Sequence, residues 1–243
     1  MANQSIGETV EAFVAPQKSP QERKTSVYGL PATAHQVVLD GLRDLVVTGE
    51  LAPGAVIKQD EIAERFGVSR VPVREALKIL QGEGYVTYVA NHGFRVTLLS
   101  ISELLEVYNM RGWLETGLVR ASVPRLARAN LEIVEDAMAR MAAAAASGDV
   151  STVSRENRRF HFQFFEPSGM HRAVRILGQL WDVADPYRPL YFEHHWDEMS
   201  INADHKKIVD AAFGQDVERT VQLINLHRSD TVMHLRELLE AGS

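Results

Sequence analysis

Histidines recur on the apolar faces of segments in the second half of the chain, where imidazole nitrogens could bind a metal ion. His161 lies one helical turn after Asn157. His205 and His227 occupy the apolar faces of two later helical segments. A lone histidine on such a face is more often an ordinary core residue. Three inward histidines are costly to bury unless each finds a partner, and a divalent ion is one such partner. The residues alone leave both interpretations open.

A second group of residues has the chemistry needed to contact DNA. Arg70, Arg74 and Lys78 recur at four-residue spacing within Gly67–Gly93. They fall opposite an apolar stripe that is made of Val73, Ala76, Leu77 and Leu80. Arginine can pair with guanine edges in the major groove, and cations also contact phosphates. The alternative is an ordinary solvated helix face, which three cations at helical spacing can equally form.

The neighbouring residues predict how this cationic face is held. Ser69 can act as an N-cap, so we expect a helix to begin near Arg70 and to stop at Gly82 and Gly84. Tyr85–Val89 is rich in β-favouring residues and predicts a strand.

A tight turn and a second strand should follow this first strand. Asn91, His92 and Gly93 form the expected turn, because Asn and Gly tolerate a positive φ. Phe94–Val96 then returns as the second strand, which places His92 at the tip of a hairpin.

Two further helices are expected before the cationic segment. Ala34–Thr48 has the apolar spacing of a scaffold helix and is followed by a Gly- and Pro-containing break. Gln59–Phe66 is expected to form a second, positioning helix.

These elements resemble the winged helix-turn-helix of the GntR superfamily of transcriptional regulators. The matching residues read V-S-R-V-P-V-R-E-A-L, then L-Q-G-E-G-Y-V, then N-H-G-F-R-V. The resemblance implies that Arg70 and Arg74 reach DNA at the start of the recognition helix and that the wing tip approaches the minor groove. Some members carry a basic residue at the start of the positioning helix, where this chain has Asp60. We therefore expect the DNA contacts to come from Ser69, Arg70, Arg74, Lys78, His92 and Gly93.

The rest of the chain predicts an all-α bundle. Its apolar residues recur at helical spacing, and glycine and proline residues interrupt them. The expected helices cover residues 100–122, 130–147, 149–166, 170–185, 197–213 and 215–240. The predicted fold is thus mainly α, with a winged domain over residues 31–99 and a helical bundle over residues 100–243.

The bundle resembles the FCD ligand-binding domain of the FadR-type branch of that superfamily. In this domain a D/N-x-x-x-H pair and two later histidines hold a divalent metal ion such as zinc or nickel. The resemblance carries that role to Asn157, His161, His205 and His227. The first position is often aspartate in the family, so asparagine is a departure here.

The same domain usually has an arginine in its first helix that helps to bind an acidic effector. Arg111 in M-R-G-W-L-E matches it. The alternative role for Arg111 is a surface salt bridge to Glu115, four residues later. A neutral ligand shell would leave a divalent ion its full charge, so a small organic acid could bind both the ion and Arg111.

Composition limits the class of protein. The chain has 243 residues, of which 45% are hydrophobic and 24% are charged, and this fits about two globular domains. It has no cysteine, so any metal must be held by nitrogen and oxygen. No long apolar run or secretion signal is evident, so we expect no membrane span and a cytoplasmic location. Residues 1–30 are polar and non-periodic, which predicts a flexible tail.

Together these features predict a metabolite-responsive regulator that binds a palindromic operator as a homodimer. Residues 32–99 carry 7 Lys and Arg against 8 Asp and Glu, so a single winged domain should bind DNA poorly. The rival class is an enzyme, a metal-dependent hydrolase or lyase on the three histidines. However, no carboxylate in the sequence lies at a motif spacing that would make it the general base of such an enzyme. His194, His195 and Trp196 form a further cluster to which we assign no role.

Overall fold

The computed structural model describes residues 33–187 and 198–241 of the chain. The predicted tail over residues 1–30 and the cluster at residues 194–196 lie outside these described residues.

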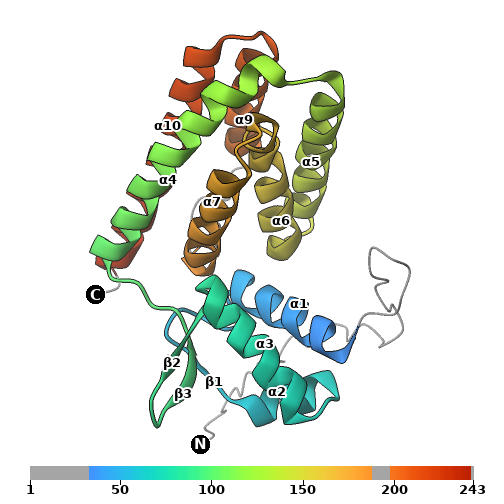
Figure 1. Ribbon diagram of the computed structural model, residues 1–243, viewed down its shortest axis with the longest axis vertical. Helices are drawn as coiled ribbons and strands as arrows, with labels where there is room; N and C mark the ends of the chain where they lie inside the picture. The colour runs from blue at the N-terminus through green and yellow to red at the C-terminus, as the bar shows by residue number, and fades with distance from the viewer. Residues whose placement is uncertain (1–32, 188–197, 242–243) are drawn as a thin grey trace, which may run out of the picture. The chain divides into compact units, whose positions relative to one another are not determined.

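The first part of the described chain is a small helical unit with a three-stranded sheet (Figure 1). Its core is formed by the apolar faces of the helices, in which Val38, Leu42, Val73 and Leu77 are fully buried. The elements in chain order are α1 (Ala34–Val47), β1 (Val56–Ile57), α2 (Gln59–Phe66), α3 (Arg70–Glu83), β2 (Val86–Val89) and β3 (Gly93–Val96).

The sheet contains one strand more than the sequence predicted. Its order is β1-β3-β2, and all its pairs are antiparallel. The additional strand β1 pairs Val56 with Arg95 and Ile57 with Phe94. A strand of two residues is too short to show an alternating pattern, so only its pairing with β3 defines it.

Helix α3 ends at Glu83, so Gly84 is the predicted stop that terminates it and Gly82 is not. Gly82 lies inside the helix, and Gly84 is the C-cap with a φ of 87°. The amide of Gly84 donates to the backbone carbonyl groups of Gln81 and Leu80. A left-handed glycine of this kind is a common way to end a helix.

The remainder of the described chain is a helical bundle, as predicted. Its helices lie within a few residues of the expected boundaries. They are α4 (Ile101–Ser122), α5 (Arg128–Ala146), α6 (Val150–Phe162), α7 (His171–Ala184), α9 (Glu198–Phe213) and α10 (Val217–Ala241), with 3-10 turns η1 (Val123–Arg125), η2 (Glu166–Ser168) and η3 (Asp185–Tyr187).

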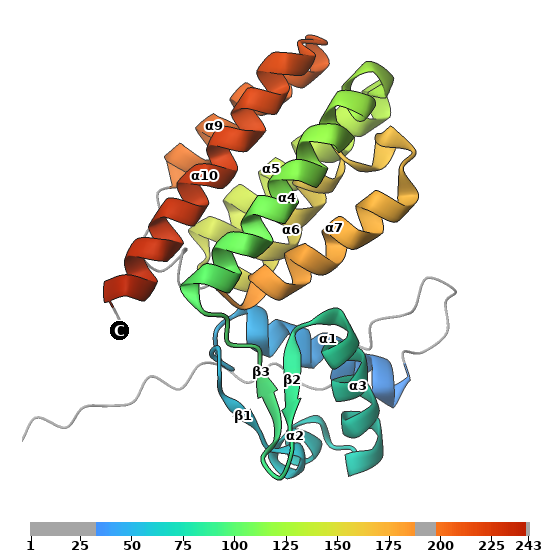
Figure 2. The same cartoon turned by 60° about the vertical axis from the view of Figure 1, so that its left-hand side comes forward.

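Side chains from most of these helices form the core of the bundle. Phe160, Phe164, Leu177 and Trp181 are among its largest buried side chains. Figure 2 shows α4 and α10 side by side along one face of the bundle. None of the helices in the described residues is long and apolar enough to cross a membrane.

Candidate metal centre and DNA-binding surface

The bundle brings the three predicted histidines together from three different helices. His161 lies on α6, His205 on α9 and His227 on α10. The ring centroids are 5.3 Å apart for His161 and His205, 5.2 Å for His161 and His227, and 4.9 Å for His205 and His227. His161 and His205 are buried, and His227 is partly buried.

The nitrogen atoms of these rings are placed close enough to share one ion. One ring nitrogen from each histidine lies within 4.8 Å of the other two. Ligands on a tetrahedral zinc ion would be about 3.4 Å apart, so small rotations of the rings bring them into range. Neutral imidazole is a ligand that zinc, nickel and similar divalent ions accept. The donor set therefore fits such an ion.

Neighbouring aromatic rings limit how far the histidines can turn. The ring of Phe160 lies 4.2 Å from that of His205, centroid to centroid, and the ring of Trp181 lies 5.3 Å from that of His161. Asn157 is also buried and lines the same cavity as His161 and His227. The amide predicted as a possible ligand thus lies on the correct side of α6.

Arg111 lies in the interior of the bundle. The salt-bridge alternative had placed it on the surface. Its side chain is only 5% exposed, and its Nε donates to the Glu115 carboxylate at 3.0 Å. The predicted ion pair between Arg111 and Glu115 is confirmed, but the prediction that it lies on the surface is wrong. The guanidinium carbon stacks on the rings of Tyr108 and Trp181, 4.6 Å and 4.1 Å from their centroids. Its Nη1 is buried and has no hydrogen-bond partner among the described residues.

Glu115 is the shared acceptor of this buried cluster. Besides Arg111, it accepts from Trp181 Nε1 at 3.1 Å and from Arg228 Nη1 at 3.0 Å. Neither Arg228 nor Trp181 was predicted from the sequence to belong to the site. The only signal for Arg228 was its position directly after His227, and Trp181 resembled any other core aromatic residue.

A small cavity joins the arginine cluster to the histidines. Its volume is about 30 Å³. Its wall combines cationic, carboxylate, amide and imidazole groups, which is unusual for a cavity inside a bundle. The lining residues are Tyr108, Arg111, Glu115, Asn157, His161, Trp181, Ile224, His227, Arg228 and Thr231.

The predicted DNA-binding side chains lie on the exposed face of α3. Ser69 is the N-cap by position, but its side chain makes no capping hydrogen bond. The side chains of Arg70, Arg74 and Lys78 are 71%, 57% and 58% exposed. All three can therefore reach a partner in solution.

The wing tip has the predicted turn geometry. Asn91 and Gly93 adopt positive φ values of 63° and 79°. His92 between them is exposed, and its Nδ1 lies 3.0 Å from the carbonyl oxygen of Ala90.

Carboxylates lie beside the cations of this surface. Arg70 donates through Nη2 to Asp60 at 2.6 Å, and Lys78 Nζ lies 3.1 Å from a Glu75 oxygen. Arg74 is only loosely paired, with its Nε 3.8 Å from Glu75. Exposed pairs of this kind contribute little stability, so phosphates can replace the carboxylates.

A winged helix-turn-helix followed by a separate helical bundle is the architecture of a DNA-binding transcriptional regulator. The model of bacterial regulatory proteins of the gntR family matches residues 34–96, and the FCD domain model matches residues 106–230. The chain belongs to the GntR family, in the branch that carries an FCD domain.

Full-length relatives support the same assignment. The chain is 26% identical to the HTH-type transcriptional repressor GlaR of Escherichia coli, over 78% of this chain and 91% of that protein. It is 28% identical to the Nta operon transcriptional regulator of Aminobacter aminovorans, over 70% and 83% of the two chains. The solved structure of E. coli McbR/YncC has the same fold, with a TM-score of 0.72 at 22% identity over 85% of this chain and 98% of that chain.

Proposed function

We propose that this transcriptional regulator binds a palindromic operator as a homodimer in the cytoplasm and responds to a small organic acid. The acid binds inside the helical bundle, beside a divalent metal ion, and changes the affinity of the winged domain for DNA. The observation that carries this proposal concerns Arg111. Its Nη1 is buried with no hydrogen-bond partner among the described residues, and the residue lines a cavity with Asn157, His161 and His227.

The charge of the cavity favours an anion. Arg111 and Arg228 share the single carboxylate of Glu115, so these three groups together carry one net positive charge. A buried guanidinium with an unused donor is costly, and a carboxylate is its best partner. A divalent ion on His161, His205 and His227 would supply further positive charge and open coordination positions for the same acid. Asn157 would complete that shell with a neutral oxygen.

The pairing of the DNA-facing cations supports a dimer. One winged domain offers few cations, and Asp60 and Glu75 already neutralise part of their charge. Two domains on a symmetric operator would double the number of phosphate contacts, and each contact adds to the affinity. GlaR is named as a repressor. We therefore propose repression that the acid relieves.

The enzyme alternative finds little support in the cavity. Among the described residues that line it, Glu115 is the only carboxylate. It already accepts hydrogen bonds from Arg111, Trp181 and Arg228, which leaves about one of its roughly four lone-pair positions. A general base needs a free lone pair directed at the substrate.

The proposal is tested by measuring operator binding with and without a panel of small carboxylates, using protein whose zinc content has been determined. Arg111→Ala should abolish the effect of the acid while leaving acid-free operator affinity within about twofold. Arg120→Ala is the matched control, because Arg120 lies on the same helix in an exposed pair with Glu218. An acid response that survives in Arg111→Ala, or a protein to which no carboxylate binds, would exclude this function for the cavity.

A further inference from the structure

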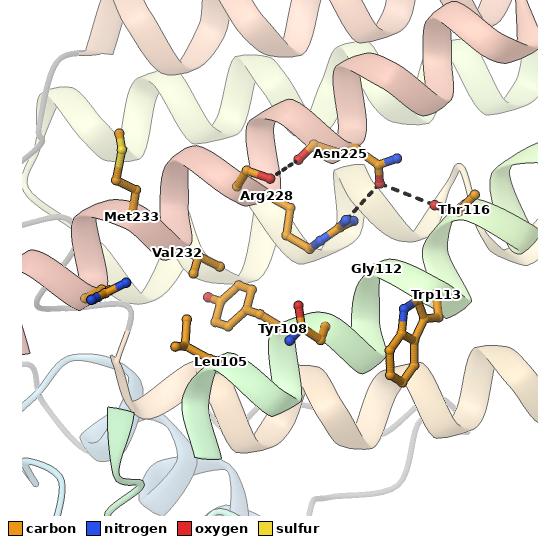
Figure 3. Close-up of a pocket in the computed structure, with 12 residues that line it drawn as sticks. Leu105, Tyr108, Gly112, Trp113, Thr116, Asn225, Arg228, Val232 and Met233 are labelled. Carbon is orange, nitrogen blue, oxygen red and sulfur yellow. Dashed lines mark hydrogen bonds between the residues drawn. The ribbon is translucent and has the colours of Figure 1, made fainter. Parts of the chain in front are cut away.

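A second and larger space lies on the surface of the bundle between α4 and α10 (Figure 3). This groove has a volume of about 490 Å³. Small-molecule sites typically range from about 300 to 1,000 Å³, so the groove has the size of a ligand site. The lining is mixed. Its apolar part comes from Leu105, Trp113, Val232 and Met233, and polar and cationic side chains form the rest.

Only a thin partition separates the groove from the buried cavity. Tyr108 and Arg228 are the two described residues that line both spaces. Figure 3 shows the Arg228 side chain reaching from α10 toward α4 at the level of Gly112. Its side chain is 14% exposed, compared with 5% for Arg111. Arg228 is therefore the charged group between solvent and the cavity.

The position of the Arg228 guanidinium depends on a glycine. A Cβ atom on Gly112 would lie 2.6 Å from Arg228 Nη2, which is closer than such atoms can approach. Arg228 is also held by Glu115 at 3.0 Å and by Asn225 Oδ1 at 2.8 Å. Asn225 in turn accepts from Thr116 Oγ1 at 3.3 Å. The partition is thus an ordered side chain that hydrogen bonds hold in place.

The cavity alone is too small for most organic acids. Its volume of about 30 Å³ accommodates roughly two water molecules when one needs about 10–15 Å³. A carboxylate group fits such a space, but a longer acid does not. An acid that reaches Arg111 must therefore displace Arg228 and leave the rest of its atoms in the groove.

We propose that the α4–α10 groove is the entrance and the tail-binding part of the sensor site, and that Arg228 is its gate. The ligand class is a monocarboxylic acid with an apolar tail. The carboxylate passes Arg228 and binds Arg111, while the tail packs on Leu105, Trp113 and Met233. This inference rests on the proposed function of the cavity.

Opening of the gate does not leave an unpaired charge. Glu115 keeps its hydrogen bonds from Arg111 and Trp181 when Arg228 turns away. The entering carboxylate offers Arg228 a new partner in exchange. A buried charge that loses its partner without replacement is strongly unfavourable, so only an anion should open the gate efficiently.

The role of the groove is tested with acids of different tail length and with a variant that places a large side chain in it. Acetate and 4-phenylbutyrate are titrated into the zinc-supplemented full-length protein by calorimetry, and their association rates are measured by stopped flow. We expect 4-phenylbutyrate to bind about tenfold more tightly than acetate. Asn109→Trp, at an exposed groove position, should slow association of both acids about tenfold and weaken only 4-phenylbutyrate binding. Glu106→Trp is the control, because Glu106 is exposed on the same helix but does not line the groove.

The gate is tested by displacing Arg228 through its neighbour. Gly112→Ala should push the guanidinium out of the partition and raise the association rate of acetate about fivefold, with unchanged zinc content. Gly117→Ala is the control on the same helix, because a Cβ there meets no atom within 4 Å. Thermal unfolding of each variant checks that the fold is retained.

The outcomes separate this inference from the proposed function. If no carboxylate of the panel binds the wild-type protein, both fail. The groove assignment is wrong if other carboxylates bind but the two probes do not. It is also wrong if Asn109→Trp and Gly112→Ala bind the probes at wild-type rates. In both cases the proposed function stands. Conversion of Asn109→Trp from dimer to monomer in light scattering would assign the groove to a second copy of the chain and overturn the proposal.

Discussion

Carboxylates neutralise part of the charge of the cations that are predicted to contact DNA. Asp60 at the start of α2 holds Arg70, and Glu75 lies between Arg74 and Lys78. If these cations contact DNA as proposed, each must exchange its carboxylate partner for a phosphate or a base edge on binding. The looser pairing of Arg74 leaves it the most available of the three cations.

Replacing Arg74 by alanine is expected to cost about 1–3 kcal/mol of operator affinity and to relax base preference, if the arginine contacts a base edge. Lys78 lies one turn later on the same face. Lys78→Ala should weaken binding to operator DNA and to non-specific DNA to a similar extent. Gel-shift titrations on operator and scrambled duplexes make the comparison. Equal losses on both duplexes for Arg74→Ala would indicate a phosphate contact.

Replacing Asp60 by asparagine should strengthen DNA binding. The change frees Arg70 from its ion pair and removes a negative charge beside the phosphates. Binding should become more dependent on salt, with the slope of log K against log salt steeper by about 0.9. Fluorescence anisotropy at several salt concentrations measures this slope. Glu61→Gln is the control, because Glu61 is paired with Lys58 instead of a predicted DNA contact. A similar gain in both variants would show a general charge effect.

At the scale of elements, helix α6 connects the candidate metal site to the end of the recognition helix. It carries Asn157 and His161, and Arg158 lies between them. The Nη1 of Arg158 pairs with Asp182 and Asp185, and its Nη2 donates to the carbonyl oxygen of Gly178. The Tyr85 hydroxyl, just after α3, donates to Asp185 at 2.9 Å. Burial raises the pKa of the Tyr85 phenol well above its usual value, with Asp185 adding to the shift, so this group remains a donor. A movement of α6 can reach α3 through these contacts.

Tyr85→Phe should therefore reduce the response of DNA binding to the acid. Loss of the buried hydrogen bond should also lower the free energy of unfolding by about 1 kcal/mol. Affinity for the operator without acid should change little, because Tyr85 is buried away from the DNA-facing side of α3. Tyr88→Phe, at an exposed position on β2, is the control. Full acid response in Tyr85→Phe would place the coupling elsewhere.

At the scale of the whole molecule, the proposed metal ion and acid would both act by binding the folded chain. A ligand that binds only the folded state stabilises it, by about 2.7 kcal/mol at one hundred times its dissociation constant. The same linkage makes the effects of acid and operator reciprocal. An acid that weakens operator binding tenfold represents about 1.4 kcal/mol of coupling, and the operator must weaken acid binding equally.

Chelation of the metal should accordingly lower the thermal midpoint of unfolding, and added Zn²⁺ should restore it. A change of about 2.7 kcal/mol corresponds to roughly 5–10 °C for a chain of this size. His205→Ala should show no such recovery, whereas His171→Ala, outside the cluster, should behave like wild type. Differential scanning calorimetry with elemental analysis tests this. Unchanged midpoints throughout would leave the three histidines as core residues.

Much of the fold could be predicted from local patterns. The helix boundaries follow the apolar spacing, so the bounds of α2 were predicted to the residue and α3 begins at Arg70, near which its start was expected. The wing turn was predicted because Asn91 and Gly93 suit positive φ values. Strand β1 was missed because two residues carry no period, and only the pairing of Ile57 with Phe94 makes them a strand.

The candidate site was also predicted only in part from the sequence. The sequence by itself determined which histidines could bind an ion, because helical spacing alone places His161, His205 and His227 on apolar faces. Only the tertiary structure decided which groups share one cavity. Glu115, Trp181 and Arg228 come from three helices, and their roles depend on packing across the bundle, which spacing along one helix does not encode. The position of Arg228 over Gly112 exists only because α4 and α10 lie side by side.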